Sequence, residues 1–254
     1  MNARSARTRL AVPASLLLAG GCAHAPVPVE PNAVIVAAAD RTDADRALDP
    51  GRHPVEMLAF LAISPGAHVA EIGAGGGYTT ELLARDVGRN GIVYAQNSPF
   101  VLHRFAAKPW SERLVRSAMA NVIRVDRDFD DPLPPEAKQL DEVVSAFIYH
   151  DTVWMKVDRA RMNKAIFEAL KPGGIYALLD NTAREGSGLA DVQTVHRIDE
   201  KSVIGEVLQA GFKLVGESNF LRNPADAHDW NDSPREAGDR RGTGDRFALR
   251  FQKP

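Results

Sequence analysis

The sequence predicts an α/β protein in which helices cover both faces of a largely parallel β-sheet. Apolar strand-like runs alternate with helix-like stretches along most of the chain, as in proteins with such a sheet. A glycine-rich turn joins the first expected strand to the helix that follows it. The chain has 254 residues, of which 44% are hydrophobic and 25% are charged. It is therefore long enough to bury one substantial core.

The expected elements follow from the spacing of the apolar residues. Strands are predicted at 68–72, 92–96, 122–125, 142–148, 175–179, 212–217 and 247–251. Helices are predicted at 53–63, 78–87, 157–170 and 201–210, with further helical stretches between residues 99 and 118. The helix over 157–170 should end at the Lys-Pro-Gly-Gly sequence that follows, because proline and glycine stop helices. These elements place one domain at 40–254.

The first 22 residues have the layout of a secretory signal. Arginines precede an apolar run over 10–19, and small residues then lead to Cys22. The segment resembles a bacterial lipoprotein signal, which implies a lipidated Cys22 and attachment to a membrane. Residues 23–39 are rich in proline and alanine and are predicted to form a flexible tether. The expected location is the periplasm or a membrane-anchored lipoprotein, and the cytoplasm if the signal is not used.

Composition excludes several classes of function. The formal net charge is −2, so no basic surface indicates a nucleic acid partner. A single cysteine excludes an internal disulfide framework and a cysteine-rich metal site. His150 and Asp151 adjoin one another, but no further ligands follow at a recognisable spacing, so no metal is predicted. The oligomeric state stays open.

The glycine-rich turn lies at the centre of the functional argument. In the sequence EIGAGGGYTTELLA, Gly73, Gly75 and Gly77 follow the first strand and precede a helix. Glycines allow a ligand to approach the backbone there, and the helix N-terminus offers free N–H groups. The pattern is weak alone, since several nucleotide cofactors use variants of it and a purely structural turn is an alternative. Glu71 favours a ligand with a cationic amine over one with a pyrophosphate.

Longer segments make the pattern specific. Residues 65–95 resemble the first motif of class I S-adenosylmethionine-dependent methyltransferases, and residues 121–134, 140–151 and 169–180 resemble the later segments of that family in order. This resemblance implies a Rossmann-like, seven-stranded sheet whose last strand is antiparallel. The group that it resembles includes bacterial methyltransferases with export signals. The turn also resembles that of protein isoaspartyl methyltransferases, but the serine-rich segment expected before the first strand in that family is absent.

The resemblance assigns roles to individual residues around S-adenosylmethionine. Gly73, Gly75 and Gly77 would pass beneath the methionine and ribose portions, and Glu71 would support the loop and the amine. Asp128 would accept a hydrogen bond from adenine, with Phe129 against the ring, unless Asp128 is a solvated loop carboxylate. Asn97 stands where the family usually has an acid that binds the ribose. Asn97 or Ser98 could instead cap a helix that begins at Pro99.

The reaction is expected beyond the end of the fourth strand. There His150 would act as the base, Tyr149 would orient the acceptor, and Asp151 would fix the imidazole or cap a helix. A packing role for His150 is the alternative. Asp180, Asn181 and His196 are further candidates for substrate contact. The polar segment 222–245, with His228 and Trp230, is too long for a simple turn and is predicted to lie beside the ligand site.

The sequence thus predicts methyl transfer from S-adenosylmethionine to oxygen or nitrogen of a small-molecule acceptor. Two other classes stay open. A nicotinamide-dependent oxidoreductase would use a similar glycine turn, but Glu71 and Asn97 count against it. A non-catalytic binding module of the cell envelope would reconcile an exported protein with a cofactor made in the cytoplasm.

Overall fold

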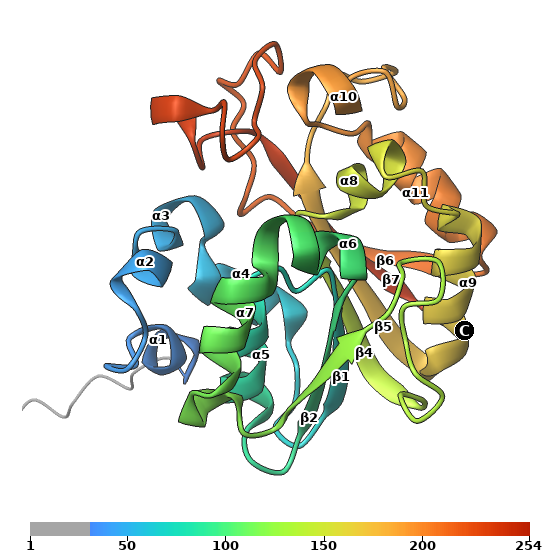
Figure 1. Ribbon diagram of the computed structural model, residues 1–254. Coiled ribbons are helices and arrows are strands. Elements are labelled where there is room, and N and C mark those ends of the chain that lie inside the picture. Colours follow the sequence, from blue (N-terminus) through green and yellow to red (C-terminus); the bar gives the residue numbers. More distant parts are fainter. Residues whose placement is uncertain (1–30) are drawn as a thin grey trace, which may run out of the picture.

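The computed structural model describes residues 31–254 and confirms the predicted fold class (Figure 1). One seven-stranded sheet has the order β3-β2-β1-β4-β5-β7-β6. Only β7 is antiparallel to its neighbours, β5 and β6, as the family resemblance implies. The strands are β1 (His68–Ile72), β2 (Ile92–Asn97), β3 (Val122–Asp126), β4 (Leu140–Ala146), β5 (Leu170–Asn181), β6 (Lys213–Ser218) and β7 (Arg246–Gln252).

Helices connect the strands and also precede the sheet. The α-helices are α1 (Pro31–Val36), α2 (Asp43–Arg46), α3 (Asp49–Arg52), α4 (Pro54–Leu61), α5 (Tyr78–Val87), α6 (Pro99–Val101), α7 (Ala107–Leu114), α8 (Tyr149–Trp154), α9 (Arg159–Ala169), α10 (Val192–Val195) and α11 (Glu200–Gln209). A π-helical turn, η1 (Leu102–Ala106), joins α6 to α7, and short 3₁₀ turns are η2 (Ser117–Met119) and η3 (Gly238–Arg240). The predicted helix 78–87 and strand 68–72 match α5 and β1 residue for residue.

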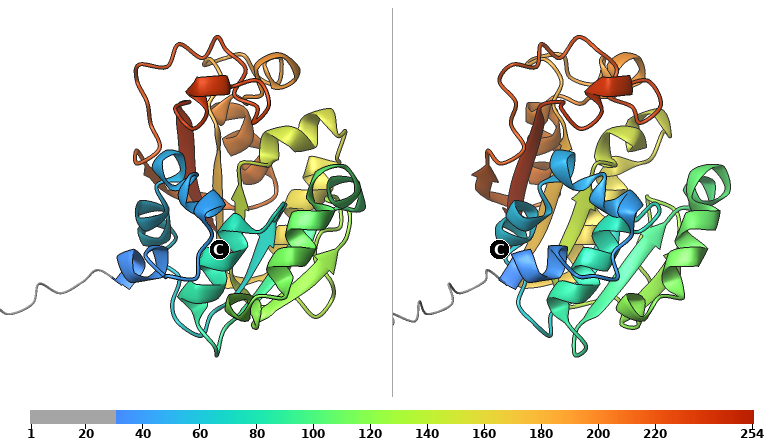
Figure 2. Two further views of the ribbon diagram at one scale, coloured as in Figure 1. Left: turned by 60° about the vertical axis from the view of Figure 1, so that its left-hand side comes forward. Right: turned by 90° about the vertical axis from the view of Figure 1, so that its left-hand side faces the viewer.

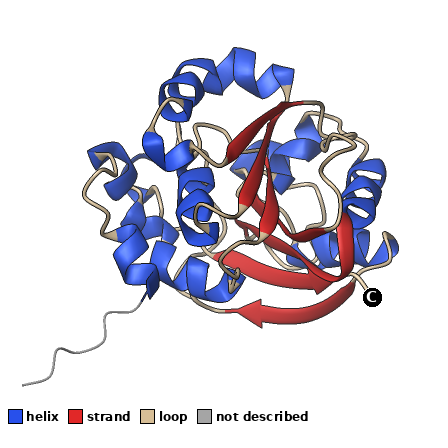
Figure 3. Ribbon diagram, turned by 90° about the horizontal axis from the view of Figure 1, so that it is seen from below, coloured by secondary structure: helices blue, strands red, loops and turns tan. Residues whose placement is uncertain are grey.

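Two apolar layers bury the two faces of the sheet, and helices flank both (Figure 3). Side chains of α4 and α5 pack on one face, where Val69 and Val144 point. Side chains of α7, α9 and α11 pack on the other face, around Ile72 and Val143. Neighbouring residues of a strand point to opposite faces, so strands covered on both sides are apolar throughout. This explains the continuous apolar runs in the sequence.

The N-terminal helices α1 to α4 lie together on one side of the sheet (Figure 2). The predicted tether over 23–39 is wrong for its last part, because residues 31–36 form α1. Ile35 and Val36 of this helix are partly buried and pack against the apolar layer of α4 and α5. The signal segment, Cys22 and the first part of the tether lie outside the described residues. Within residues 31–254, no helix has both the length and the apolar character that crossing a membrane requires.

The fourth strand begins and ends two residues earlier than predicted. It ends at Ala146, and Phe147 then adopts a left-handed backbone conformation with φ of 60°. The chain turns there and enters α8 at Tyr149. The tripeptide Tyr-His-Asp at 149–151 therefore begins a helix rather than ending a strand, and its side chains point in three different directions.

Candidate functional site

The glycine turn adopts a conformation that only glycine favours. Gly73, Gly75 and Gly77 have φ of 75°, 55° and 84°. A Cβ atom on Gly73 would lie 2.6 Å from Ile148, and one on Gly77 would lie 2.6 Å from Arg113. No atom lies within 4 Å of the Cβ position at Gly75. Gly73 and Gly77 are thus required by packing within the protein, whereas Gly75 faces open space.

Two amide side chains at the end of β2 hold this turn in place. Oε1 of Gln96 accepts a hydrogen bond from the Gly73 N–H at 2.9 Å. Asn97 accepts from the Gly75 N–H at 2.8 Å and donates to the Gly75 carbonyl at 3.1 Å. Asn97 is fully buried, so a ribose contact would have to use its second amide hydrogen. Ser98 is the residue that caps α6, through a bond of 3.2 Å from the Val101 N–H.

Glu71 lies beneath the turn, in the interior. Thr80 of α5 donates a hydrogen bond to its carboxylate. Burial raises the pKa of Glu71 to about 7, although the bond from Thr80 opposes this shift. The carboxyl is thus joined to the first turn of α5, which agrees with the predicted support of the loop. A direct contact with a cofactor amine stays a prediction.

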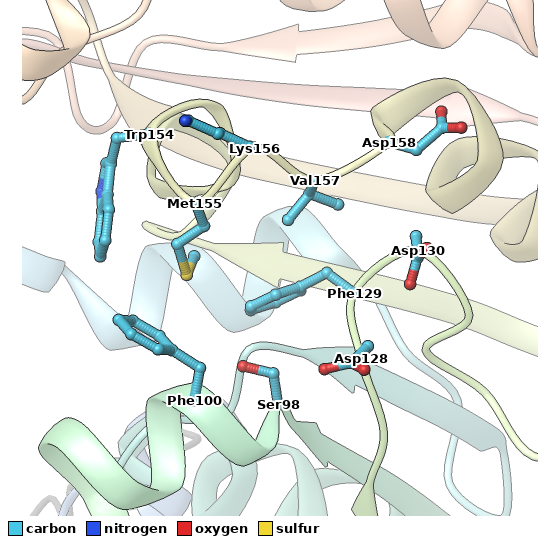
Figure 4. Close-up of a pocket in the computed structure, with 10 residues that line it drawn as sticks. All are labelled: Ser98, Phe100, Asp128, Phe129, Asp130, Trp154, Met155, Lys156, Val157 and Asp158. Carbon is cyan, nitrogen blue, oxygen red and sulfur yellow. The ribbon is translucent and has the colours of Figure 1, made fainter.

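A first cavity, of about 460 Å³, opens beyond the ends of β2 and β3 (Figure 4). Its lining includes the predicted Asp128 and Phe129 and several apolar side chains that the sequence did not indicate. Phe100 and Trp154 pack edge to face with ring centroids 5.8 Å apart, and Met155 lies beside them. Phe129 is 2% exposed, whereas Asp128 is exposed to solvent. We refer to this space as the aromatic cavity.

A second cavity, of about 520 Å³, lies beyond the ends of β4 and β5. Its walls come from α2 and α3, from the start of α8, and from the segment that precedes β7. The polar side chains that line it are Arg52, His150, Asp151, Asn181, His196, Asp232, Arg241 and Arg246. We refer to it as the charged cavity. Both cavities lie at the carboxyl edge of the parallel strands, where ligands of such sheets bind.

His150 is fixed in the charged cavity by a buried carboxylate. Its Nδ1–H donates to Oδ1 of Asp180 at 2.5 Å, and its backbone N–H donates to Oδ2 at 2.7 Å. Burial lowers the pKa of His150, but the carboxylates of Asp180 and Asp151 outweigh this effect and raise the pKa to about 10. At neutral pH the ring therefore carries a proton on both nitrogens. His150 can act as the predicted base only after it loses the proton on Nε2.

Tyr149 does not face either cavity, so the prediction that it orients the acceptor is wrong. It is fully buried and donates to Glu206 of α11 at 2.7 Å. Its hydroxyl also accepts a bond from Asn163 of α9 at 2.8 Å. Because Tyr149 and His150 are consecutive helical residues, their side chains diverge, and Tyr149 joins the core while His150 faces the cavity.

His196, which the sequence analysis named as a candidate for substrate contact, lines the charged cavity beside His150. It ends α10, and its ring packs edge to face on His150 with centroids 4.2 Å apart. Its Nε2 lies 3.7 Å from Oδ1 of Asp151. The expectation of no metal considered only neighbouring ligands in the sequence. The fold brings a third possible ligand, His196, close to His150 and Asp151 from a distant segment of the chain.

The segment 222–245 forms part of the charged cavity, at the same end of the molecule as α8 and α10 (Figure 1). A fully buried arginine, Arg197, holds it through an ion pair of 2.8 Å with Asp226. The guanidinium carbon of Arg197 also lies 4.7 Å from the ring centre of Trp230. His228 pairs with Asp245 at 3.2 Å. The predicted location is therefore confirmed, but His228 and Trp230 stabilise the segment and do not line the charged cavity.

Comparison with known proteins agrees with this geometry. Residues 50–131, less than half of the chain, match the family model of protein-L-isoaspartate(D-aspartate) O-methyltransferase. The matched part contains the glycine turn, β1 to β3, and the segment with Asp128 and Phe129. No curated protein matches the chain.

Solved structures share the fold over most of the chain. An S-adenosylmethionine-dependent methyltransferase from Aquifex aeolicus has a TM-score of 0.57 and 17% identity, over 84% of this chain and 100% of that chain. One from Mesorhizobium loti has a TM-score of 0.54 and 14% identity, over 81% and 99%. The cyclase SpnF has a TM-score of 0.56 and 14% identity, over 83% and 82%. These structural similarities establish the fold, and the cyclase shows that this fold serves more than one reaction.

Proposed function

We propose that the chain is a class I S-adenosylmethionine-dependent methyltransferase, which its fold and the match over residues 50–131 support, and that it methylates an anionic small molecule in the charged cavity. The observation that carries this proposal is the pair of cavities at one edge of the sheet, with the glycine turn beneath them. A nicotinamide cofactor is disfavoured, because the strand order with an antiparallel β7 differs from that of dinucleotide-binding sheets.

The aromatic cavity suits the adenine ring. Phe100, Phe129 and Trp154 offer ring faces and edges for stacking, which stabilises aromatic pairs by about 1 kcal/mol each. The exposed carboxylate of Asp128 lies at the same cavity and is a suitable acceptor for the exocyclic amine. From there the cofactor would extend over Gly75, the one glycine of the turn that faces open space.

Arg52 is suited to bind the cofactor's carboxylate. It ends α3, and its guanidinium lies 4.8 Å from the ring centre of Tyr78 and 5.0 Å from that of Phe147. Tyr78 follows the glycine turn and Phe147 follows β4, so the cation lies between the two. Among residues 31–254, no carboxylate lies within ion-pair distance of Arg52. This leaves its charge available to a ligand, and a charge-assisted bond to a carboxylate would be strong.

The acceptor would occupy the rest of the charged cavity. Arg241 is exposed there, and Arg246 is buried at the start of β7, where it lies 3.6 Å from Asp232. With Arg52, three arginines line the space against two aspartates, Asp151 and Asp232. An acceptor with a carboxylate or phosphate group would complement this charge. His150 lies on the opposite wall, and its predicted role as the base stays part of the proposal. Holding methyl donor and acceptor in contact, away from water, supplies much of the rate enhancement.

The cofactor proposal is tested by calorimetry on the full-length protein with S-adenosylmethionine and with methylthioadenosine, which lacks the amino-acid portion. Arg52→Met should weaken S-adenosylmethionine binding about tenfold, as expected for one charge-assisted bond, and leave methylthioadenosine binding unchanged. Arg184→Met removes a largely exposed arginine and serves as the matched control. Undetectable binding of S-adenosylmethionine at millimolar concentration would refute both the enzyme proposal and a non-catalytic module that binds this cofactor.

A second candidate acceptor is an isoaspartyl residue of a protein, the acceptor named in the description of the family whose model matches residues 50–131. That segment covers the cofactor half and ends before β4, so it carries no information about the acceptor side. Isoaspartate offers a carboxylate, which suits the arginines of the charged cavity. Methyl transfer to an isoaspartyl peptide, with the ordinary aspartyl peptide as control, distinguishes this acceptor from a small molecule.

Export and membrane attachment through Cys22 remain part of the proposal. The basic start, the short apolar run and the small residues before the cysteine support them. Labelled fatty acid should enter the wild-type chain in bacterial cells, and Cys22→Ser should prevent it. Recovery of a cytoplasmic product that retains its initiating methionine would exclude export.

A further inference from the structure

Three side chains in the charged cavity are arranged like the ligands of a metal ion. Their donor atoms, from His150, Asp151 and His196, all lie within 4.8 Å of one another. Oδ1 of Asp151 lies 3.3 Å from Nε2 of His150 and 3.7 Å from Nε2 of His196. Two ligands about 2.1 Å from one zinc ion in tetrahedral geometry are about 3.4 Å apart. The three atoms could thus contact a common ion with small side-chain movements.

The second observation is an unpartnered nitrogen. His150 is 1% exposed, and its Nε2 lies within ion-pair distance of Asp151 but makes no hydrogen bond of acceptable geometry with any of the described residues. The other ring nitrogen is bonded to Asp180, so Nε2 is the atom that points toward Asp151 and His196. A buried polar atom without a partner is costly, and such atoms often indicate a missing ion or water. This nitrogen would be satisfied by a cation between the three side chains.

The surroundings of the three residues also suit a cation. Asp180 bonds the rear nitrogen of His150, which is the carboxylate–histidine arrangement that orients metal-binding imidazoles. Trp154 donates to Oδ1 of Asp151 at 2.6 Å and fixes that carboxylate.

We propose that His150, Asp151 and His196 bind a divalent transition-metal ion at the wall of the charged cavity. Two imidazoles and one carboxylate favour zinc, cobalt or iron over magnesium and calcium, which prefer oxygen ligands. Three protein ligands leave a position open, and the cavity lies on that side. Resting on the proposed function, the ion would bind the acceptor's oxygen or nitrogen and lower its pKa, so that the acceptor releases its proton to solvent. The freed lone pair would then form a bond to the methyl carbon while the bond from that carbon to the sulfonium sulfur breaks and the demethylated cofactor leaves. With Nε2 bound to the ion, His150 would be a ligand and not the base.

The site is tested with cobalt on full-length protein that carries no histidine tag. We expect one equivalent of Co²⁺ to bind, with visible absorption bands of nitrogen and oxygen ligation and without the near-ultraviolet band of a thiolate. His196→Asn should weaken binding about 100-fold or more, because one of three ligands is lost. His228→Asn is the matched control. His228 and His196 have φ of 57° and 59°, a conformation that asparagine tolerates, and each lies near an aspartate.

The outcomes separate this proposal from the proposed function. Absence of stoichiometric binding, equal binding by the His196→Asn protein, or a thiolate band from Cys22 would overturn the metal site. Binding of S-adenosylmethionine is measured on the same preparations. Cobalt binding without cofactor binding would refute the methyltransferase proposal and support the metal site. Cofactor binding without cobalt binding would refute the metal site and support the methyltransferase proposal. Asp151→Asn should also weaken cobalt binding. Thermal unfolding of this variant without metal verifies that the loss of binding does not reflect loss of the fold.

Discussion

The aromatic cavity and the charged cavity lie at one edge of the same sheet, yet they are built differently. The aromatic cavity is formed by three short stretches that follow successive strands, and aromatic and other apolar side chains make up half of its lining. The charged cavity takes residues from the N-terminal helices, from α8 and α10, and from the segment before β7. The first is thus assembled locally and the second by distant parts of the chain. Changes in the two cavities should therefore have separable effects.

The largest effect is expected at Arg197, which holds the wall of the charged cavity. It is fully buried, and Arg197→Met would leave Asp226 buried without its cation. Loss of one partner of a buried ion pair costs about 3–5 kcal/mol. We expect this loss in the free energy of unfolding, measured with urea, while binding of methylthioadenosine stays unchanged. Arg222→Met, which removes a partly exposed pair with Glu200, should cost less than about 1 kcal/mol. Weaker binding of methylthioadenosine by the Arg197→Met protein would show that the two cavities are coupled.

The next effect concerns the open glycine beneath the cofactor. Gly75→Asn keeps a residue type that tolerates positive φ but places a side chain in the open space. Binding of S-adenosylmethionine should weaken about 100-fold, or about 3 kcal/mol, because the backbone can no longer be approached closely. Gly66→Asn makes the same change at another open glycine with positive φ, in the turn before β1. Calorimetry that finds both proteins equal to wild type would exclude a ligand over this turn.

An intermediate effect is expected for the pH dependence of stability through Glu71. Its pKa rises from 4.5 to about 7 on folding because of burial. The folded state thus binds the proton more tightly, so this contribution to stability is complete below pH 4.5 and is lost as the pH rises to 7. Glu71→Gln should remove roughly 3 kcal/mol of that decline. Urea unfolding of both proteins across this range measures it, and parallel curves would contradict the prediction.

The smallest effect is expected at the rim of the aromatic cavity. Phe100→Ala removes one half-exposed ring from the proposed adenine site. It should weaken S-adenosylmethionine and methylthioadenosine equally, by about 1 kcal/mol, in contrast to Arg52→Met. Phe105→Ala is the control, since Phe105 is similarly exposed and does not line the cavity. If Phe100→Ala weakened the binding of S-adenosylmethionine but not of methylthioadenosine, the adenine ring would not lie against Phe100.

The sequence by itself determined the sheet, the glycine turn and two residues of the aromatic cavity, Asp128 and Phe129. The sheet and the turn depend on local patterns: apolar alternation fixes a strand, and a glycine that follows a strand marks a turn. Asp128 and Phe129, just after β3, were implied by the resemblance to the methyltransferase family. The exceptions on this side are Phe100, Trp154 and Met155, whose apolar side chains are indistinguishable in sequence from core residues.

Only the tertiary structure decided the composition of the charged cavity. It separated His150 from Tyr149, because one turn of α8 directs the two side chains to opposite environments. It brought His196 onto His150 and Asp151, and it placed Arg52 between the glycine turn and β4. It also showed that Asn97 binds the backbone of Gly75. No local pattern encodes these contacts, since they join residues that are far apart in the chain and meet only when the helices pack on the sheet.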